Sequence, residues 1–206
     1  MEVIMEFATP VGMFYTEEKD LTTDIFEKIT NITEQDTEVF KYLDQSKTTP
    51  DDLHLQDFFK PLVTYIHTKV DKFSAEVLGI NSTDIKLSSM WSNVHEPGSK
   101  HHPHQHPNSF LSGVYYPYIP ECKDPGNIIF IDPRHAKNMV HADFVKSSCI
   151  SNRQIWVTPK TGLLLLFPSW LEHGTEPFIG KQGQKRTAIS FNYQLTLCTQ
   201  KTMRIL

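Results

Sequence analysis

Cysteines and long apolar runs are scarce in this sequence, and their scarcity excludes several classes of protein. The three cysteines, Cys122, Cys149 and Cys198, form no CxxC pair, and their odd number argues against a disulfide framework. No run of about 18 apolar residues is present, so we expect no membrane span. The first residues also lack the basic and apolar segments of a signal peptide. We therefore expect a protein of a reducing compartment, the cytoplasm or, if a phage encodes the chain, the host cytoplasm.

Neither the charge nor the motifs of common nucleotide-binding and hydrolytic sites indicate a function. The net charge is -4, with 20 basic and 24 acidic residues among 206, which does not suggest a general nucleic-acid binder. The motifs GxxxxGK[ST] and GxSxG are absent, so a phosphate-binding loop and a serine nucleophile elbow find no support. A peptide or a small molecule is therefore favoured over nucleic acid as the substrate.

Turn-forming residues are rare before residue 85 and frequent after it. Of the 13 prolines and 9 glycines, those before residue 85 are Pro10, Pro50, Pro61, Gly12 and Gly79. In that part, apolar residues recur at helical spacing over residues 21–32 and 55–77. Pro50 suits the first turn of the longer helix and Gly79 suits its end, whereas Pro61 should kink the helix or mark its start.

The rest of the chain has the pattern of short strands separated by turns, as in an antiparallel sandwich or barrel. The expected strands are residues 85–94, 110–118, 127–132, 154–157, 162–167 and 186–197. We therefore predict a single domain over residues 1–206. Its residues 1–84 form a helical layer that packs on a mainly β core of residues 85–206.

The last of these strands is polar on one face and apolar on the other. Arg186, Ala188, Ser190, Asn192 and Gln194 share one face, because side chains alternate along a strand. The apolar residues between them share the opposite face. Such a strand suits a sheet wall with helices outside and a polar cavity inside.

Four of the ten histidines lie within the six residues 101–106, directly before an apolar strand. Imidazole is a common metal ligand that suits iron, zinc, copper and nickel. His104 and His106 can face one ion, since residues i and i+2 of an extended chain point to the same side. His173, which follows an apolar strand and a turn, is the best candidate for a third ligand.

Other residues could bind a cosubstrate beside the metal. A metal held on one triangular face leaves positions for a cosubstrate and dioxygen. Arg186 can pair bidentately with the far carboxylate of a dicarboxylic cosubstrate, and Tyr116 and Ser190 can add hydroxyl hydrogen bonds. Further candidates for the pocket lining are Trp91, Asn93, Ser112 and Asn192.

These residues lie in motifs that resemble a known family. The motifs are HxHPxSxLSGVYY (residues 104–116), GNIIFIDPR (126–134), FPSWLEH (167–173) and the opening FATPV (7–11). They look like the signature of a family of 2-oxoglutarate/Fe(II) oxygenases found in bacteria and marine phages, and more distantly like prolyl hydroxylases. The resemblance implies a double-stranded β-helix, the jelly-roll or cupin-like barrel. It also implies Fe(II) as the metal and Arg186, Tyr116 and Ser190 as the residues that hold 2-oxoglutarate.

The second histidine departs from the pattern of the wider superfamily, which has His-x-Asp/Glu. A neutral imidazole at His106 would not offset a charge of Fe(II), so affinity and redox tuning would differ. Alternatively, His106 lies outside the ligand set, and water or a remote carboxylate, Asp132 or Glu172, completes the site.

The leading hypothesis is an Fe(II)/2-oxoglutarate-dependent dioxygenase that hydroxylates an unidentified substrate and forms succinate and carbon dioxide. A cosubstrate-free, cupin-like metalloenzyme is an alternative, because a site of three histidines would suit it. A non-catalytic jelly-roll binding module is another. Residues 95–100 and 133–151 are expected to face the substrate, and an exposed strand edge could support a homodimer.

Overall fold

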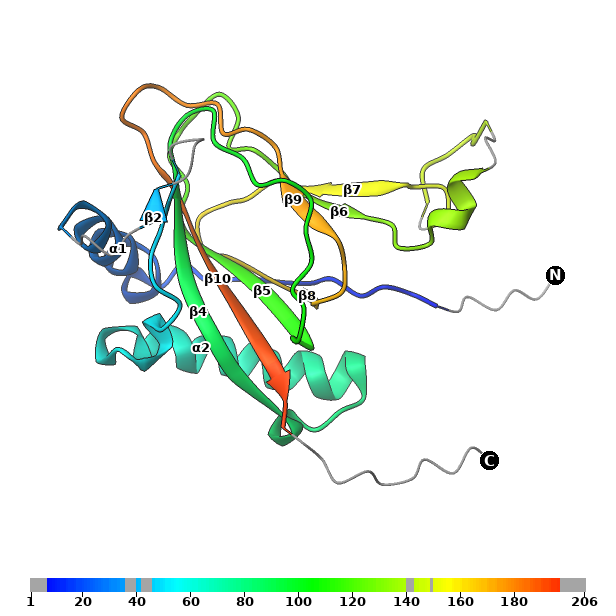
Figure 1. Cartoon of the computed structure of the whole chain (residues 1–206), viewed down its shortest axis with the longest axis horizontal. Helices are drawn as coiled ribbons and strands as arrows, with labels where there is room; N and C mark the ends of the chain where they lie inside the picture. Colours follow the sequence, from blue (N-terminus) through cyan, green and yellow to red (C-terminus); the bar gives the residue numbers. More distant parts are fainter. Residues whose placement is uncertain (1–6, 36–39, 42–45, 140–142, 149, 197–206) are drawn as a thin grey trace.

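Two antiparallel β-sheets form the body of the molecule (Figure 1). The computed structural model describes residues 7–35, 40–41, 46–139, 143–148 and 150–196. The larger sheet has the order β1-β8-β5-β10-β4-β3-β2, and the smaller has the order β7-β6-β9. The strands are β1 (Gly12–Tyr15), β2 (Phe40–Lys41), β3 (Lys47–Thr48), β4 (Ile85–His95), β5 (Leu111–Tyr118), β6 (Ile128–Ile131), β7 (Gln154–Val157), β8 (Leu163–Pro168), β9 (His173–Thr175) and β10 (Arg186–Leu195).

Helices cover the outer face of the larger sheet (Figure 1). They are α1 (Thr23–Gln35) and α2 (Lys60–Phe73), which continues as a π-helical turn (Ser74–Leu78). Short 3-10 helices span Lys19–Leu21, Leu53–Leu55, Asp57–Phe59, Ser82–Asp84 and His135–Met139. Pro61 lies in the first turn of α2, and Gly79 ends the helical segment at φ 66°. None of the described helices combines the length and apolarity needed to cross a membrane.

Strand β8 shows why the larger sheet has a core on each face. Leu164 and Leu166 point outward into the core shared with α1 and α2, whereas Leu163 and Leu165 point toward the smaller sheet. A strand buried on both faces needs a continuous apolar run, which is what LLLLF provides. In β10, Ile189 likewise packs against the helices, so the polar face of that strand points inward, as the sequence predicted.

The mainly β class and the six expected strands are confirmed, with strand ends that differ by no more than two residues where both are described. One helix detail was wrong: Pro50 precedes two 3-10 helices rather than opening α2. Of the two alternatives for Pro61, the structure confirms that it marks the start of that helix. The predicted end of the last strand at Leu197, together with Cys149 and Cys198, lies outside the described residues. Strands β1, β2, β3 and β9 were not predicted.

Candidate active site

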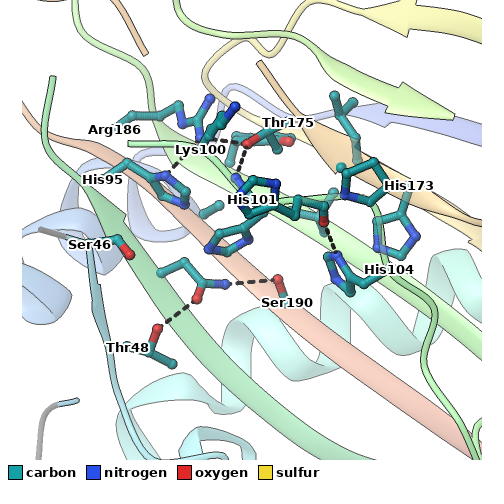
Figure 2. A pocket seen from close by; sticks show the side chains of 18 of the residues that line it. Ser46, Thr48, His95, Lys100, His101, His104, His173, Thr175, Arg186 and Ser190 are labelled. Atoms are coloured by element: carbon teal, nitrogen blue, oxygen red, sulfur yellow. Dashed lines mark hydrogen bonds between the residues drawn. The ribbon is translucent and has the colours of Figure 1, made fainter. Parts of the chain in front are cut away.

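A cavity of about 740 Å³ lies between the two sheets, on the inner face of the larger one (Figure 2). Its walls come from β4, β5 and β10 on one side, from β6 and β9 on the other, and from residues 98–106. The residues that line it include His104, His106, His173, Tyr116, Arg186, Ser190, Trp91 and Asn93. The structure therefore brings eight of the ten predicted site residues together around one space.

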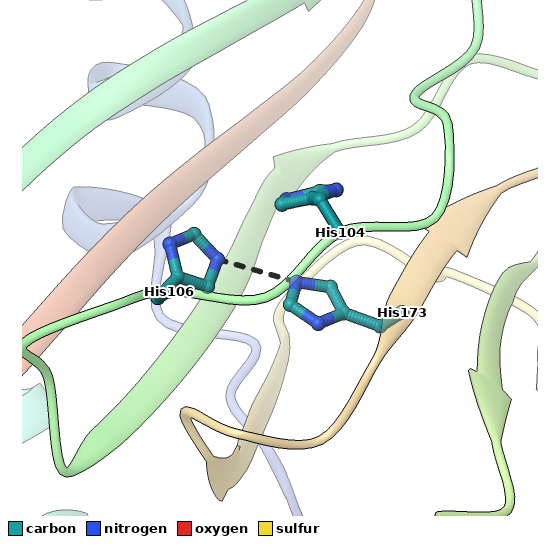
Figure 3. A group of neighbouring side chains, drawn as sticks. All are labelled: His104, His106 and His173. Carbon is teal, nitrogen blue, oxygen red and sulfur yellow. Dashed lines mark hydrogen bonds between the residues drawn. The ribbon is translucent and has the colours of Figure 1, made fainter.

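Three histidines converge at one end of this cavity (Figure 3). One ring nitrogen from each of His104, His106 and His173 lies within 4.8 Å of the others. The Nε2 atoms of His106 and His173 are 3.3 Å apart. This is close to the separation of about 3 Å for two imidazole nitrogens at right angles around an ion with bonds of about 2.1 Å. Within the described part of the chain, no other group of His, Cys, Asp or Glu converges in this way.

Backbone pairing brings the histidines together from distant parts of the sequence. His104 and His173 form an antiparallel bridge, in which each backbone N–H donates to the other residue's carbonyl at 2.9 and 3.0 Å. The backbone N–H of His106 donates to the carbonyl of Ser169 at 3.0 Å. The segment before β5 is thus fixed against β9 by main-chain hydrogen bonds, which do not depend on a bound ligand.

Hydrogen bonds also select which ring nitrogen is available to a metal. The Nδ1 of His104 lies 2.8 Å from the carbonyl oxygen of His102, and the Nδ1 of His173 lies 2.8 Å from that of Leu171. A carbonyl only accepts, so both Nδ1 atoms must be the N–H donors. Each Nε2 then carries the lone pair, which is the arrangement in which histidine binds metals with its other nitrogen held by the protein. The Nε2 of His173 accepts a hydrogen bond from the Nε2 of His106 at 3.3 Å, at the position a metal would take (Figure 3).

The burial of two of these rings favours their neutral, metal-binding form. Desolvation by burial, assisted by the neighbouring imidazole of His104, lowers the pKa of His106 to about 4. Burial lowers the pKa of His173 to about 3, against the opposing effect of its hydrogen bond to the carbonyl of Leu171. Protons therefore do not compete with a metal for these nitrogens at neutral pH.

Arg186 is the most deeply buried charge of the cavity, with 1% of its surface exposed. Its Nη1 donates to the carbonyl oxygens of Pro125 at 2.7 Å and of Gly126 at 3.0 Å. Its Nη2 donates to the Nδ1 of His95 at 3.0 Å, and the hydroxyl of Thr175 lies 3.5 Å away. Its Nε–H has no partner among the described residues. Burial lowers the pKa of Arg186, but arginine stays charged because its usual pKa is so high.

Tyr116 lines the same cavity from β5 and is almost fully buried. Burial raises the pKa of its hydroxyl to about 12, although the nearby charge of Arg186 acts in the opposite direction. The phenol is therefore protonated at neutral pH and can donate a hydrogen bond to an anion that enters beside Arg186.

Ser190 lies apart from Arg186. It follows Arg186 by four positions in β10, which corresponds to about 13 Å along an extended strand. Its hydroxyl accepts a hydrogen bond from the Nδ2 of Asn93 at 3.2 Å, and the Oδ1 of Asn93 accepts one from the hydroxyl of Thr48 at 2.9 Å (Figure 2). Trp91 is opposite Ser190 in the sheet, and its ring lies 5.9 Å from that of His106. These four residues form a polar and aromatic wall close to the histidines.

Ser112 and Asn192 were expected in the pocket, and the structure corrects this: neither lines the cavity. The hydroxyl of Ser112 donates to the Oδ1 of Asn192 at 2.7 Å and lies 2.8 Å from the hydroxyl of Ser169. Both residues have the inward orientation that strand alternation predicts. They lie farther along β5 and β10, where they satisfy each other in a buried network.

The two carboxylates considered as alternative ligands are not part of the histidine cluster. Asp132 forms an ion pair with Arg134 at 2.9 Å and also accepts the backbone N–H of that residue. Glu172 directly precedes His173, and neighbouring residues of a strand point to opposite faces.

Sequence reasoning assigned no role at the metal or cosubstrate site to several residues that the structure places there. His95, His101 and Thr175 line the cavity, and Gly126 lies against Arg186. His95 is opposite Arg186 in the pairing of β4 with β10, so only the register of the two strands reveals it. The expected substrate-facing loop, residues 95–100, contributes His95, Gly98 and Lys100 to the lining.

Solved structures with the same architecture define the fold. A prolyl-4-hydroxylase of Pseudomonas putida matches with a TM-score of 0.63 and 11% identity, over 91% of this chain and 94% of that one. HygX of Streptomyces hygroscopicus, with nickel and 2-oxoglutarate bound, matches with 0.62 and 13%, over 91% and 83%. The epimerase SnoN from nogalamycin biosynthesis matches with 0.66 and 11%, over 90% and 76%. The fold is thus the double-stranded β-helix of 2-oxoglutarate oxygenases, here with two sheets that do not join into a closed barrel among the described residues.

The family follows from the sequence itself. The profile of the family described as "Putative 2OG-Fe(II) oxygenase" matches residues 89–192, half of the chain. The chain belongs to this family and is a 2-oxoglutarate-dependent oxygenase, with Fe(II) and 2-oxoglutarate as cofactors and dioxygen as cosubstrate. The family predicted from the motifs is therefore confirmed. No curated protein matches the chain.

Proposed function

We propose that this oxygenase hydroxylates its substrate. His104, His106 and His173 hold Fe(II), and Arg186 binds the far carboxylate of 2-oxoglutarate. One observation supports this most strongly: three imidazole nitrogens converge in the same cavity as a buried guanidinium. Within the described part of the chain, no carboxylate lies within ion-pair distance of Arg186. Asp124 acts on Arg186 only from beyond ion-pair distance. A buried charge without a paired counter-charge is costly, and a dicarboxylate that also chelates the metal would supply one.

The donors around Arg186 fit a carboxylate. Both hydrogens of Nη1 are taken by backbone carbonyls, whereas the Nε–H has no partner. A carboxylate oxygen would satisfy this buried donor with a charge-assisted hydrogen bond. The protonated hydroxyl of Tyr116 can donate to the same anion. Ser190 and Asn93, beside the histidines, are better placed to contact the substrate than the far end of 2-oxoglutarate.

The chain's own part in the reaction is to orient the reactants and to exclude water. When bound, Fe(II) and 2-oxoglutarate would supply the oxidising chemistry with dioxygen as the oxidant: one oxygen atom of O2 enters succinate, formed from 2-oxoglutarate with loss of carbon dioxide, and the other enters the substrate. The neutral rings of His106 and His173 keep their lone pairs available without proton release. Trp91 packs beside His106, where an apolar ring would help to exclude water from that ligand.

An anaerobic visible spectrum tests this proposal. Fe(II) and 2-oxoglutarate are added to the metal-free protein without oxygen, singly and together. We expect an absorption band that needs both components and that weakens in an Arg186→Ala variant which still binds iron. Bound iron with no such band would contradict the proposed cosubstrate site.

The cosubstrate-free metalloenzyme considered from the sequence is not in accord with the 2-oxoglutarate/Fe(II) oxygenase family, although the histidine cluster lacks a carboxylate ligand. We also propose the division of the chain into an outer layer of residues 1–84 and a core of residues 85–206. The homodimer stays a prediction.

A further inference from the structure

His95 is the side chain that fixes the far end of Arg186, and the motifs give it no role. The two residues are paired across β4 and β10, and both are 1% exposed. The Nη2 of Arg186 donates to the Nδ1 of His95 at 3.0 Å, as the dashed line in Figure 2 marks. A hydrogen bond between two fully buried side chains on adjacent strands restricts the orientation of the guanidinium.

His95 is itself held in place and kept neutral. Its ring hydrogen-bonds to the backbone of Ser99 and lies 4.6 Å from the ring of His101. Burial, with the adjacent charge of Arg186, lowers the pKa of His95 well below its usual value. The ring therefore offers a lone pair at Nδ1 and carries no charge.

All the acceptors around Arg186 are neutral. They are two backbone carbonyls, a hydroxyl and the imidazole of His95. A carboxylate in place of His95 would form an internal ion pair with Arg186. Such an ion pair would neutralise the positive charge of Arg186 that attracts an incoming anion. The anion would then have to compete with the internal carboxylate for the guanidinium.

We propose that His95 is a positioning residue that orients Arg186 through a neutral acceptor and so leaves its charge for the far carboxylate of 2-oxoglutarate. This inference rests on the proposed function of Arg186. It makes the charge at residue 95, rather than its size, the property that decides whether the cosubstrate binds.

A matched pair of variants tests the inference, because Asn and Asp both place an oxygen close to the position of Nδ1. His95→Asn keeps a neutral acceptor, whereas His95→Asp introduces a side chain of the same shape as Asn that carries a negative charge. The affinity for 2-oxoglutarate is measured by calorimetry on Ni(II)-loaded protein without turnover. The affinity for Ni(II) and the unfolding midpoint of each variant are measured in parallel.

We expect His95→Asn to bind 2-oxoglutarate within about threefold of the wild type. His95→Asp should bind at least about 30-fold more weakly, which corresponds to about 2 kcal/mol, the range of a charge-assisted hydrogen bond. Both variants should remain folded and bind Ni(II) like the wild type. Similar affinities in the two variants, whether both high or both low, would overturn the inference and leave the role of Arg186 standing. Absence of binding to the wild type would overturn the proposed function and this inference with it.

Discussion

Gly126 is expected to control both the stability of the site and its affinity for 2-oxoglutarate. It has φ +72°, a conformation that L-residues with a side chain rarely adopt, and its carbonyl accepts a hydrogen bond from Arg186. A Cβ at this position would lie 2.5 Å from the carbonyl oxygen of Glu176 and 2.6 Å from the Nη1 of Arg186. Gly126→Ala must therefore displace either backbone or the guanidinium.

Gly183 provides a matched control. It has φ +85°, but a Cβ there would meet nothing within 4 Å. Both substitutions pay the cost of the left-handed conformation, about 1–2 kcal/mol. Gly126→Ala adds an overpacking cost of about 1–3 kcal/mol. We thus expect the free energy of unfolding to fall by about 2–5 kcal/mol for Gly126→Ala and by about 1–2 kcal/mol for Gly183→Ala.

Urea denaturation of the metal-free protein measures these free energies, and calorimetry on Ni(II)-loaded protein measures the affinity for 2-oxoglutarate. The affinity should fall about tenfold or more in Gly126→Ala, because displacement of Arg186 weakens a charge-assisted hydrogen bond worth about 1.5–3 kcal/mol. Gly183→Ala should bind like the wild type. Equal losses of stability in the two variants, with unchanged affinity in both, would refute the reasoning.

Three further predictions use the same assays. Arg186→Met should weaken 2-oxoglutarate binding about 100-fold, equivalent to about 2.7 kcal/mol, and leave Ni(II) affinity unchanged; full retention of 2-oxoglutarate binding would contradict the assignment. In the metal-free protein, the unfolded state binds protons first as the pH falls, because folding lowers the pKa of His106 to about 4 and that of His173 to about 3 from 6.5. The free energy of unfolding should therefore be lower at pH 5.5 than at pH 7.5 by about 1 kcal/mol for each ring, and His173→Gln should reduce this loss. Ser112→Ala leaves the Oδ1 of Asn192 without its donor, so stability should fall by about 1–3 kcal/mol while 2-oxoglutarate affinity is unchanged; a change in affinity would show that Ser112 belongs to the pocket.

The elements that the sequence revealed are those whose signal is local. The continuous apolar run of β8 reflects burial on both faces, and the alternation in β10 reflects one apolar and one polar face, so both could be recognised in the sequence. His104 and His106 follow from strand periodicity, and His173 follows from its place after an apolar strand. The structure brings their nitrogens within 4.8 Å of one another.

The elements that the sequence did not reveal depend on long-range pairing. Strands β2 and β3 contain two residues each, and β9 contains three, too few to carry a period. The role of His95 depends on its register opposite Arg186. Ser112 and Asn192 lie on the inward face of their strands, as predicted, but too far along those strands to line the cavity. Periodicity specifies the face of a residue and not its position along the strand.

A crystal structure of the protein with Ni(II) and 2-oxoglutarate, with anomalous data at the nickel edge, tests the central claim most directly. We predict one strong anomalous peak among the Nε2 atoms of His104, His106 and His173, and the far carboxylate of 2-oxoglutarate against Arg186. A metal bound elsewhere, a carboxylate of the chain in place of His106, or 2-oxoglutarate that does not contact Arg186 would contradict the account.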